Sequence, residues 1–237
     1  MSADFFDIPY QMDSFLNTNY SDILSLGSNC YPKLFIDKVV KPTNGETQLF
    51  DYIGASMWSI NALIRADFQD ITNPADFAKI PIVKSVPPIV TNTKYYLRFL
   101  HDAQTVAAVQ NPEFIAKMQR RVDRFTGALN GSGQNQSQGQ ILCIRYQENQ
   151  AGRVVYPANP VTNEYDELVT FVALVKEKYG KDVTVIYINT EQDGWNDAHT
   201  ILSVKIPSLN VDYRIVHAKI KHLFIQKDVV AQLRTAP

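Results

Sequence analysis

The chain has 237 residues, of which 45% are hydrophobic and 20% are charged, a composition typical of a globular protein with an apolar core. Its 23 lysines and arginines nearly balance 24 aspartates and glutamates, so the formal net charge is −1. This near-neutrality excludes an overall field that would attract nucleic acid or an anionic membrane, and we expect no nucleic-acid partner.

The N-terminal segment shows no targeting signal. Residues 1–20 lack a basic region followed by an apolar stretch, and no apolar run approaches the roughly 18 residues that span a bilayer. We therefore expect a cytoplasmic protein without a transmembrane segment, with an N-terminal arm at 1–20 and a single α/β domain at 21–237. In a reducing compartment Cys30 and Cys143 are expected to be free thiols, Cys143 as inert packing within an apolar run.

Apolar runs alternate with helical patterns from residue 23 onward. In chain order we expect a strand at 23–26, a helix ending before Pro42, a helix at 57–64, turns with an edge hairpin at 70–95, a strand at 95–101, a helix at 112–129, a flexible loop at 131–140, a strand at 141–146, a helix at 166–179, a strand at 183–188, a strand at 213–216 and a short helix at 229–233. This alternation predicts a mostly parallel, Rossmann- or flavodoxin-like three-layer sheet with helices on both faces.

Ligands bind such sheets at the carboxyl ends of the strands. Cys30, Asn189 and the loop after Arg145 would share that edge, and we expect Asn189 to contact substrate. The region between Asp193 and Asp197 is the nearest approach to an acidic pair for a metal-bound nucleotide sugar, and it is weak.

Cys30 is the strongest candidate for chemistry, because it follows the first strand through a Gly27-Ser28-Asn29 turn and opens the next helix. The thiolate is the reactive form of cysteine, and backbone N–H groups at a helix start favour it. The same groups, with Ser28 and Asn29, would hold substrate or an oxyanion during acyl transfer. A buried, unreactive cysteine in a tight turn is the alternative.

A nucleophilic cysteine needs a base, and His101, followed by Asp102, is the first candidate. Asp102 or Asp51 would orient its imidazole. Asp51 lies among apolar residues, where capping of the next helix and substrate binding are alternatives. The rival bases are His199, His217 and His222. The histidines lack metal-ligand spacing, so we expect no metal site.

Arginines provide candidate anion contacts. Arg145 ends an apolar strand, so we expect it to contact a substrate anion or to form a salt bridge with Asp51 or Glu148. Three further arginines lie off the apolar face of the helix at 112–129, namely Arg120, Arg121 and Arg124. They form either an anion-binding face, with Arg121 as a substrate contact, or a solvated surface.

Several of these segments resemble, in the same order, motifs of the putative papain-like cysteine peptidase family of bacteria and viruses. They are Ser25 to Cys30 (SLGxxC), Leu49 to Tyr52 (Pro-Phe-Asp-Trp, with Leu for Pro and Tyr for Trp), Ala66 to Asp70, His101-Asp102 (followed by Ala103 where the family has an aromatic residue), Arg120 to Phe125, and Ile141 to Arg145. The resemblance covers about residues 21–190. It implies Cys30 as nucleophile and His101 as base.

The resemblance implies a cysteine-nucleophile hydrolase or acyltransferase acting on a peptide, glycan or small molecule. Members of the family are often encoded near glycan biosynthesis functions, and the turn before Cys30 also resembles the start of a capsule-biosynthesis family that binds acetyl-CoA. A parallel sheet fits poorly with a papain fold, where the cysteine opens a long helix in a separate lobe.

Two alternatives remain, a glycosyltransferase that binds a nucleotide sugar at the sheet edge and a non-catalytic binding module. No cofactor is required by any of them, although a nucleotide sugar or acyl-CoA would be the donor in group transfer. The sequence does not indicate an oligomeric state.

Overall fold

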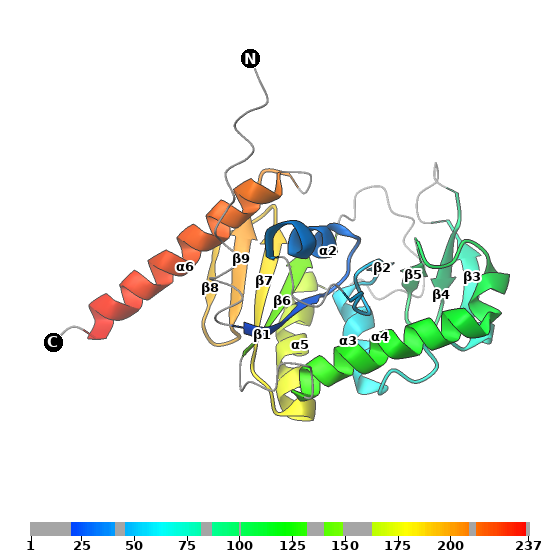
Figure 1. Cartoon of the computed structure of the whole chain (residues 1–237). Helices are drawn as coiled ribbons and strands as arrows, with labels where there is room; N and C mark the ends of the chain where they lie inside the picture. Colours follow the sequence, from blue (N-terminus) through cyan, green and yellow to red (C-terminus); the bar gives the residue numbers. More distant parts are fainter. Residues whose placement is uncertain are drawn as a thin grey trace, which may run out of the picture.

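A computed structural model of the chain describes residues 20–40, 46–81, 87–99, 101–131, 140–148, 163–208 and 212–235. The expected N-terminal arm, apart from Tyr20, and most of the expected flexible loop at 131–140 lie outside these residues. The described elements form two sheets with helices packed around them (Figure 1). The chain is therefore a mixed α/β protein.

The larger sheet has the strand order β1-β6-β7-β9-β8. Its strands are β1 (Tyr20–Ser25), β6 (Gln140–Tyr146), β7 (Val183–Asn189), β9 (Ile201–Lys205) and β8 (Gly194–Asn196). The first four are parallel and β8 is antiparallel at the edge, so the mostly parallel sheet is confirmed. The order of the parallel strands follows the chain, without the reversal that creates the ligand crevice of Rossmann and flavodoxin sheets. That part of the expectation is not confirmed.

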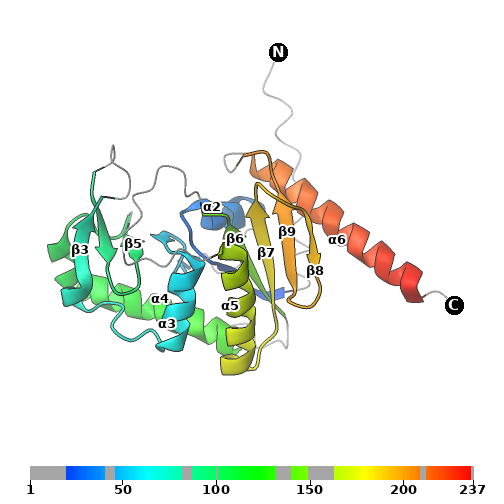
Figure 2. The same cartoon turned by 180° about the vertical axis from the view of Figure 1, so that it is seen from behind.

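Apolar side chains cover both faces of this sheet, which explains the continuous apolar runs of its strands. On one face, alternate residues such as Cys143 and Val185 pack with α3 (Met57–Arg65), α4 (Pro112–Asn130) and α5 (Glu164–Tyr179). On the other, residues such as Ile144 and Ile186 pack with α2 (Tyr31–Phe35), the π-helical turn η1 (Ile36–Val40) and α6 (Tyr213–Thr235). Figures 1 and 2 show α5 and α6 on opposite sides of the sheet.

The smaller sheet is antiparallel, with the order β2-β5-β4-β3. Its strands are β2 (Ile53–Gly54), β5 (Leu97–Phe99), β4 (Ile89–Asn92) and β3 (Phe77–Ile80), and short 3-10 turns η2 (Pro74–Asp76) and η3 (Val106–Gln110) flank it. The expected edge hairpin corresponds to β3 and β4. Helix α4 runs past both sheets (Figure 1), and its Phe114 packs against Phe77 and Phe99 of the smaller one.

The expectations for the last part of the chain were partly wrong, since residues 229–233 are helical as expected but are not a separate element. Strand β9 was not expected, and the expected strand at 213–216 and helix at 229–233 belong to the single helix α6. Val216, Ile220 and Phe224 recur every four residues and pack on the sheet from one face of this helix. Among the described residues, no helix is both long and apolar enough to cross a membrane.

Candidate active site

The turn between β1 and α2 places Cys30 at the carboxyl end of the parallel strands. Gly27 has φ 66° and Ser28 has φ 75°, both in the left-handed region. A Cβ on Gly27 would lie 3.0 Å from the Ile53 carbonyl oxygen, so this position requires glycine. Cys30 is partly exposed and is the N-cap residue of α2. The structure thus gives Cys30 the strand–turn–helix position that the sequence predicts, while its role stays a prediction.

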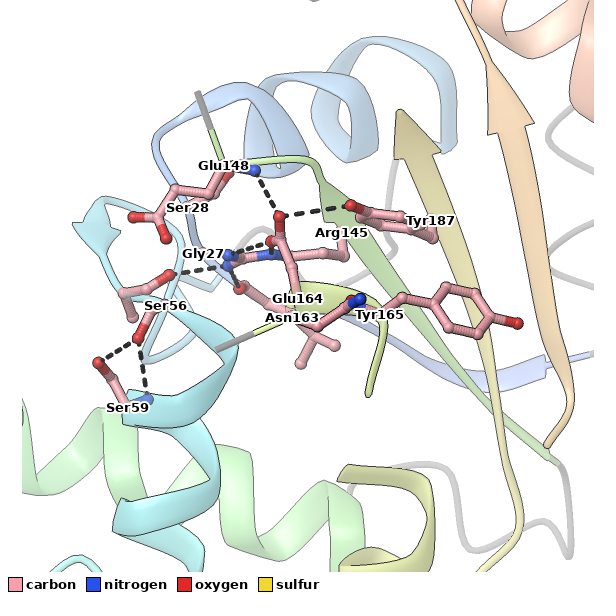
Figure 3. A network of polar contacts seen from close by, with 12 residues as sticks. Gly27, Ser28, Ser56, Ser59, Arg145, Glu148, Asn163, Glu164, Tyr165 and Tyr187 are labelled. Carbon is pink, nitrogen blue, oxygen red and sulfur yellow. Dashed lines mark hydrogen bonds and ion pairs between the residues drawn. The ribbon is translucent and has the colours of Figure 1, made fainter. Parts of the chain in front are cut away.

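The side chain of Arg145 holds this turn from inside the protein. Its exposed fraction is 0%, and its Nη1 donates to the carbonyl oxygens of Leu26 (2.6 Å) and Ala55 (2.8 Å). Its Nε and Nη2 lie 2.7 and 2.6 Å from Oε1 of Glu164 (Figure 3). The ion-pair partner is therefore Glu164, and the expected salt bridge to Asp51 or Glu148 was wrong. Because these contacts are internal, they give no support to a substrate-binding role for Arg145.

Glu164 connects Arg145 to the loop after β6. Its Oε2 accepts hydrogen bonds from the backbone N–H of Glu148 (2.8 Å) and from the hydroxyl of Tyr187 (3.4 Å), as Figure 3 shows. Glu164 is the first residue of α5. The start of that helix is thereby fastened to the carboxyl ends of β6 and β7.

Asp51 is buried beneath α2, with an exposed fraction of 1%. Its Oδ2 accepts a hydrogen bond from the backbone N–H of Gln48 (2.7 Å) and lies 3.5 Å from Nζ of Lys33, one turn after Cys30. Burial raises the pKa of Asp51, and the Lys33 charge offsets only part of this effect. Within the described residues its Oδ1 has no hydrogen-bond partner.

The expected capping role of Asp51 was wrong. The N-cap of α3 is Ser56, whose hydroxyl oxygen accepts a hydrogen bond from the backbone N–H of Ser59 (3.1 Å). Asp51 instead closes the turn that precedes β2 through Gln48.

His101 is exposed and follows β5. In the antiparallel pair of β2 and β5, Ile53 lies opposite Phe99. The pairing ends there, and the His101 ring packs edge-on against Tyr52 with centroids 5.7 Å apart. The contacts of the described residues include none between His101 and Cys30. The role of His101 as base therefore stays a prediction.

Asp102 turns away from His101 toward helix α4. Its two carboxylate oxygens lie 2.9 Å from Nζ of Lys117 and 2.7 Å from Nη1 of Arg121. Burial alone would raise the pKa of Asp102, but these two cations outweigh it and lower the pKa. Arg121, expected to contact substrate, is buried in this ion pair, and Arg124 donates to the carbonyl oxygen of Thr47.

The rival histidines lie in three different places. His199 precedes Thr200, whose carbonyl oxygen accepts from the N–H of Val185 near the start of β7. His199 thus lies near the start of β7, at the opposite end of that strand from Asn189. Both other histidines lie on α6, where His222 is exposed and His217 is 2% exposed.

His217 provides a prediction about pH. Burial, with a contribution from Lys221, lowers its pKa from 6.5 to about 4. Because the unfolded chain takes up this proton first, the folded state should lose stability as pH falls from about 6.5 to about 4, by up to about 3 kcal/mol. Urea unfolding at pH 7 and pH 4.5 should show a smaller loss for His217→Leu than for the unmodified chain. If His217→Leu lost as much stability between pH 7 and pH 4.5 as the unmodified chain, the prediction would be contradicted. His222→Ala serves as the matched control.

Two further predicted residues have structural roles. The side-chain Oδ1 of Asn189 accepts from the N–H groups of Glu191 and Gln192, both at 2.8 Å, and its Nδ2 donates to the carbonyl oxygen of Tyr187. These bonds shape the loop after β7. Cys143 is fully buried, and burial raises its pKa.

In the part of the chain that is described, no cluster of three His, Cys, Asp or Glu side chains is placed to hold a metal ion.

Three residues near the turn escaped the sequence analysis, namely Lys33, Arg98 and Glu164. Nη2 of Arg98 donates to the carbonyl oxygen of Ser28 (3.3 Å) and lies 2.7 Å from Oε1 of Glu148. Ser28 is 70 positions away from Arg98 in the chain, so no local spacing connects them. Of the three residues, only Lys33 could have been noticed in the sequence, because it is a lysine one turn after the candidate nucleophile.

Comparison with known proteins adds one finding. A family model described as putative papain-like cysteine peptidase matches residues 21–193, which include Cys30, Asp51 and His101. No curated protein and no solved structure matches the chain.

Proposed function

The chain belongs to the putative papain-like cysteine peptidase family, and from this we propose that it is a cysteine hydrolase with Cys30 as the nucleophile. The observation that carries the proposal is the family match over residues 21–193, within which Cys30 is the partly exposed cysteine and Cys143 the buried one. A buried thiol in a parallel strand has no access to substrate, so the chemistry falls to Cys30.

In the proposed reaction the sulfur of Cys30 attacks a substrate carbonyl, and His101 removes the thiol proton and returns it to the leaving group. Asp51 is the better candidate to orient His101, because it precedes Tyr52, whose ring contacts the ring of His101, and because both oxygens of Asp102 are bound to cations. Ser28 and Asn29 would contact the substrate. This chemistry requires no cofactor.

The alternatives to a hydrolase differ in the substrate and in the molecule that accepts the transferred group. An acyltransferase would use the same thioester intermediate with an acceptor other than water, and a glycan-linked substrate fits either reaction. Transfer from a nucleotide sugar was expected to use Arg145 or the arginines of α4. Arg145 and Arg121 are buried in ion pairs, so no observation favours that reading.

Alkylation by iodoacetamide tests the nucleophile directly. At pH 7 we expect Cys30 of the full chain to react at least about 10-fold faster than N-acetylcysteine, because His101 as general base would take the thiol proton as the sulfur attacks. Mass spectrometry of tryptic peptides separates Cys30 from Cys143, which should stay unlabelled until the protein unfolds. The variant His101→Ala should lose most of this advantage, whereas His222→Ala, which removes an exposed histidine of α6, should retain it. A rate for Cys30 no higher than that of the free thiol would contradict the proposal.

A further inference from the structure

The turn before Cys30 is held at two carbonyl oxygens by arginines from different sheets. Arg145 of β6 donates to the carbonyl oxygen of Leu26, and Arg98 of β5 donates to that of Ser28. Between these two contacts the backbone adopts its left-handed conformations, one of them at the non-glycine residue Ser28. A non-glycine residue keeps such a conformation only where its surroundings enforce it. The two arginines supply part of that enforcement.

The contact of Arg98 also determines the direction of an N–H group. In a planar trans peptide the carbonyl oxygen and the next N–H point in opposite directions. A guanidinium on the Ser28 carbonyl therefore directs the N–H of Asn29 to the opposite side of that peptide plane. No partner for the N–H of Asn29 or of Cys30 is found among the described residues. This leaves a donor next to the sulfur available for a ligand.

Arg98 is itself held in place. Its guanidinium is ion-paired with Glu148 at 2.7 Å, and their side chains are only 13% and 9% exposed. The backbone N–H of Glu148 is bound to Glu164, which pairs with Arg145, so the two arginines belong to one connected network. Gly54 leaves the space for Arg98, because a Cβ there would lie 2.8 Å from Nε of Arg98.

We propose that Arg98 is a positioning residue that orients the N–H of Asn29 to stabilise the oxyanion formed when Cys30 attacks a carbonyl. The inference rests on the proposed cysteine hydrolase function. In that step the carbon–sulfur bond forms as the π electrons of the carbonyl move to its oxygen, and the negative oxygen accepts the hydrogen bond. When the carbonyl re-forms, the leaving group departs with its electron pair. A donor fixed before the reaction favours this transition state without reorganisation.

Two reagents separate this role from a merely structural one. Acylation of Cys30 by 4-nitrophenyl acetate passes through an oxyanion, whereas alkylation by iodoacetamide displaces iodide at a saturated carbon and forms none. We expect Arg98→Met to slow acylation by about 10- to 100-fold while alkylation changes less than about twofold. Arg98→Lys keeps a donor for the Ser28 carbonyl and should recover part of the loss.

A second variant tests the same contact in case Arg98→Met does not fold. Gly54→Ala keeps both charges but pushes the guanidinium away, so it should also slow acylation selectively. Arg120→Met, which removes an exposed arginine of α4, is the matched control and should change neither rate. Equal losses in acylation and alkylation, or no loss in either, would overturn the role of Arg98. A native chain that is not acylated at Cys30 would instead overturn the proposed function itself.

Discussion

Replacing Cys30 with alanine is expected to reduce hydrolysis of 4-nitrophenyl acetate by at least about 1,000-fold, to the rate of the uncatalysed reaction. The reason is that the variant retains the turn and its N–H groups but has no atom that forms the thioester. Stopped-flow release of 4-nitrophenol measures the rate, and mass spectrometry of the quenched reaction detects the acyl group on the native chain.

The control for this prediction uses the other cysteine. Cys143→Ala removes a fully buried thiol of β6 and should leave the rate within about twofold. Hydrolysis that survives in Cys30→Ala, with the acyl group found elsewhere, would show that the family's nucleophile is not Cys30 in this chain. Circular dichroism spectra of both variants should match that of the native chain.

The largest loss of stability is expected from Arg145→Met. This side chain is fully buried, and it pairs with Glu164 while donating to the carbonyl oxygens of Leu26 and Ala55. Its removal leaves a buried carboxylate and two carbonyl oxygens without their donor. We expect the free energy of unfolding in urea to fall by about 3 to 5 kcal/mol, a large part of the 5 to 15 kcal/mol typical of a domain.

A double variant tests whether the unpaired charge is the cause. Arg145→Met combined with Glu164→Gln removes the lone carboxylate and should recover part of the lost stability. Arg120→Met, on the exposed side of α4, should change stability by less than about 0.5 kcal/mol. A similar small effect at Arg145 would mean that the contacts of its guanidinium contribute little to the stability of the turn.

The sequence predicted the elements whose patterns are long and regular. The apolar runs at 141–146 and 183–188 became β6 and β7, and the stripe at 112–129 became α4, because each pattern agrees with the environment of its element. The run at 213–216 was misassigned as a strand. Its β-branched residues favour a strand locally, but apolar residues four apart continue beyond it, and burial of that stripe on the sheet decided for a helix.

The sequence predicted only the part of the site that is formed by residues adjacent in the chain. The Gly27-to-Cys30 turn depends on neighbouring residues, so its position could be inferred from the sequence. The partner of Arg145 could not, because Glu164 lies 19 positions further along the chain and is brought in by the packing of α5. Adjacency in the chain also misled, since Asp102 follows His101 directly yet contacts Lys117 and Arg121, which are four residues apart on α4.

The one-directional strand order has a consequence for the newly synthesised chain. The apolar residues of β6 and β7 that α6 covers, such as Ile144 and Ile186, leave the ribosome well before Val216 and Ile220 of α6 are made. A protein is produced from its N-terminus at about 5 to 20 residues per second. For several seconds the nascent sheet therefore exposes one apolar face. Such a face is the kind of surface that chaperones for hydrophobic segments bind.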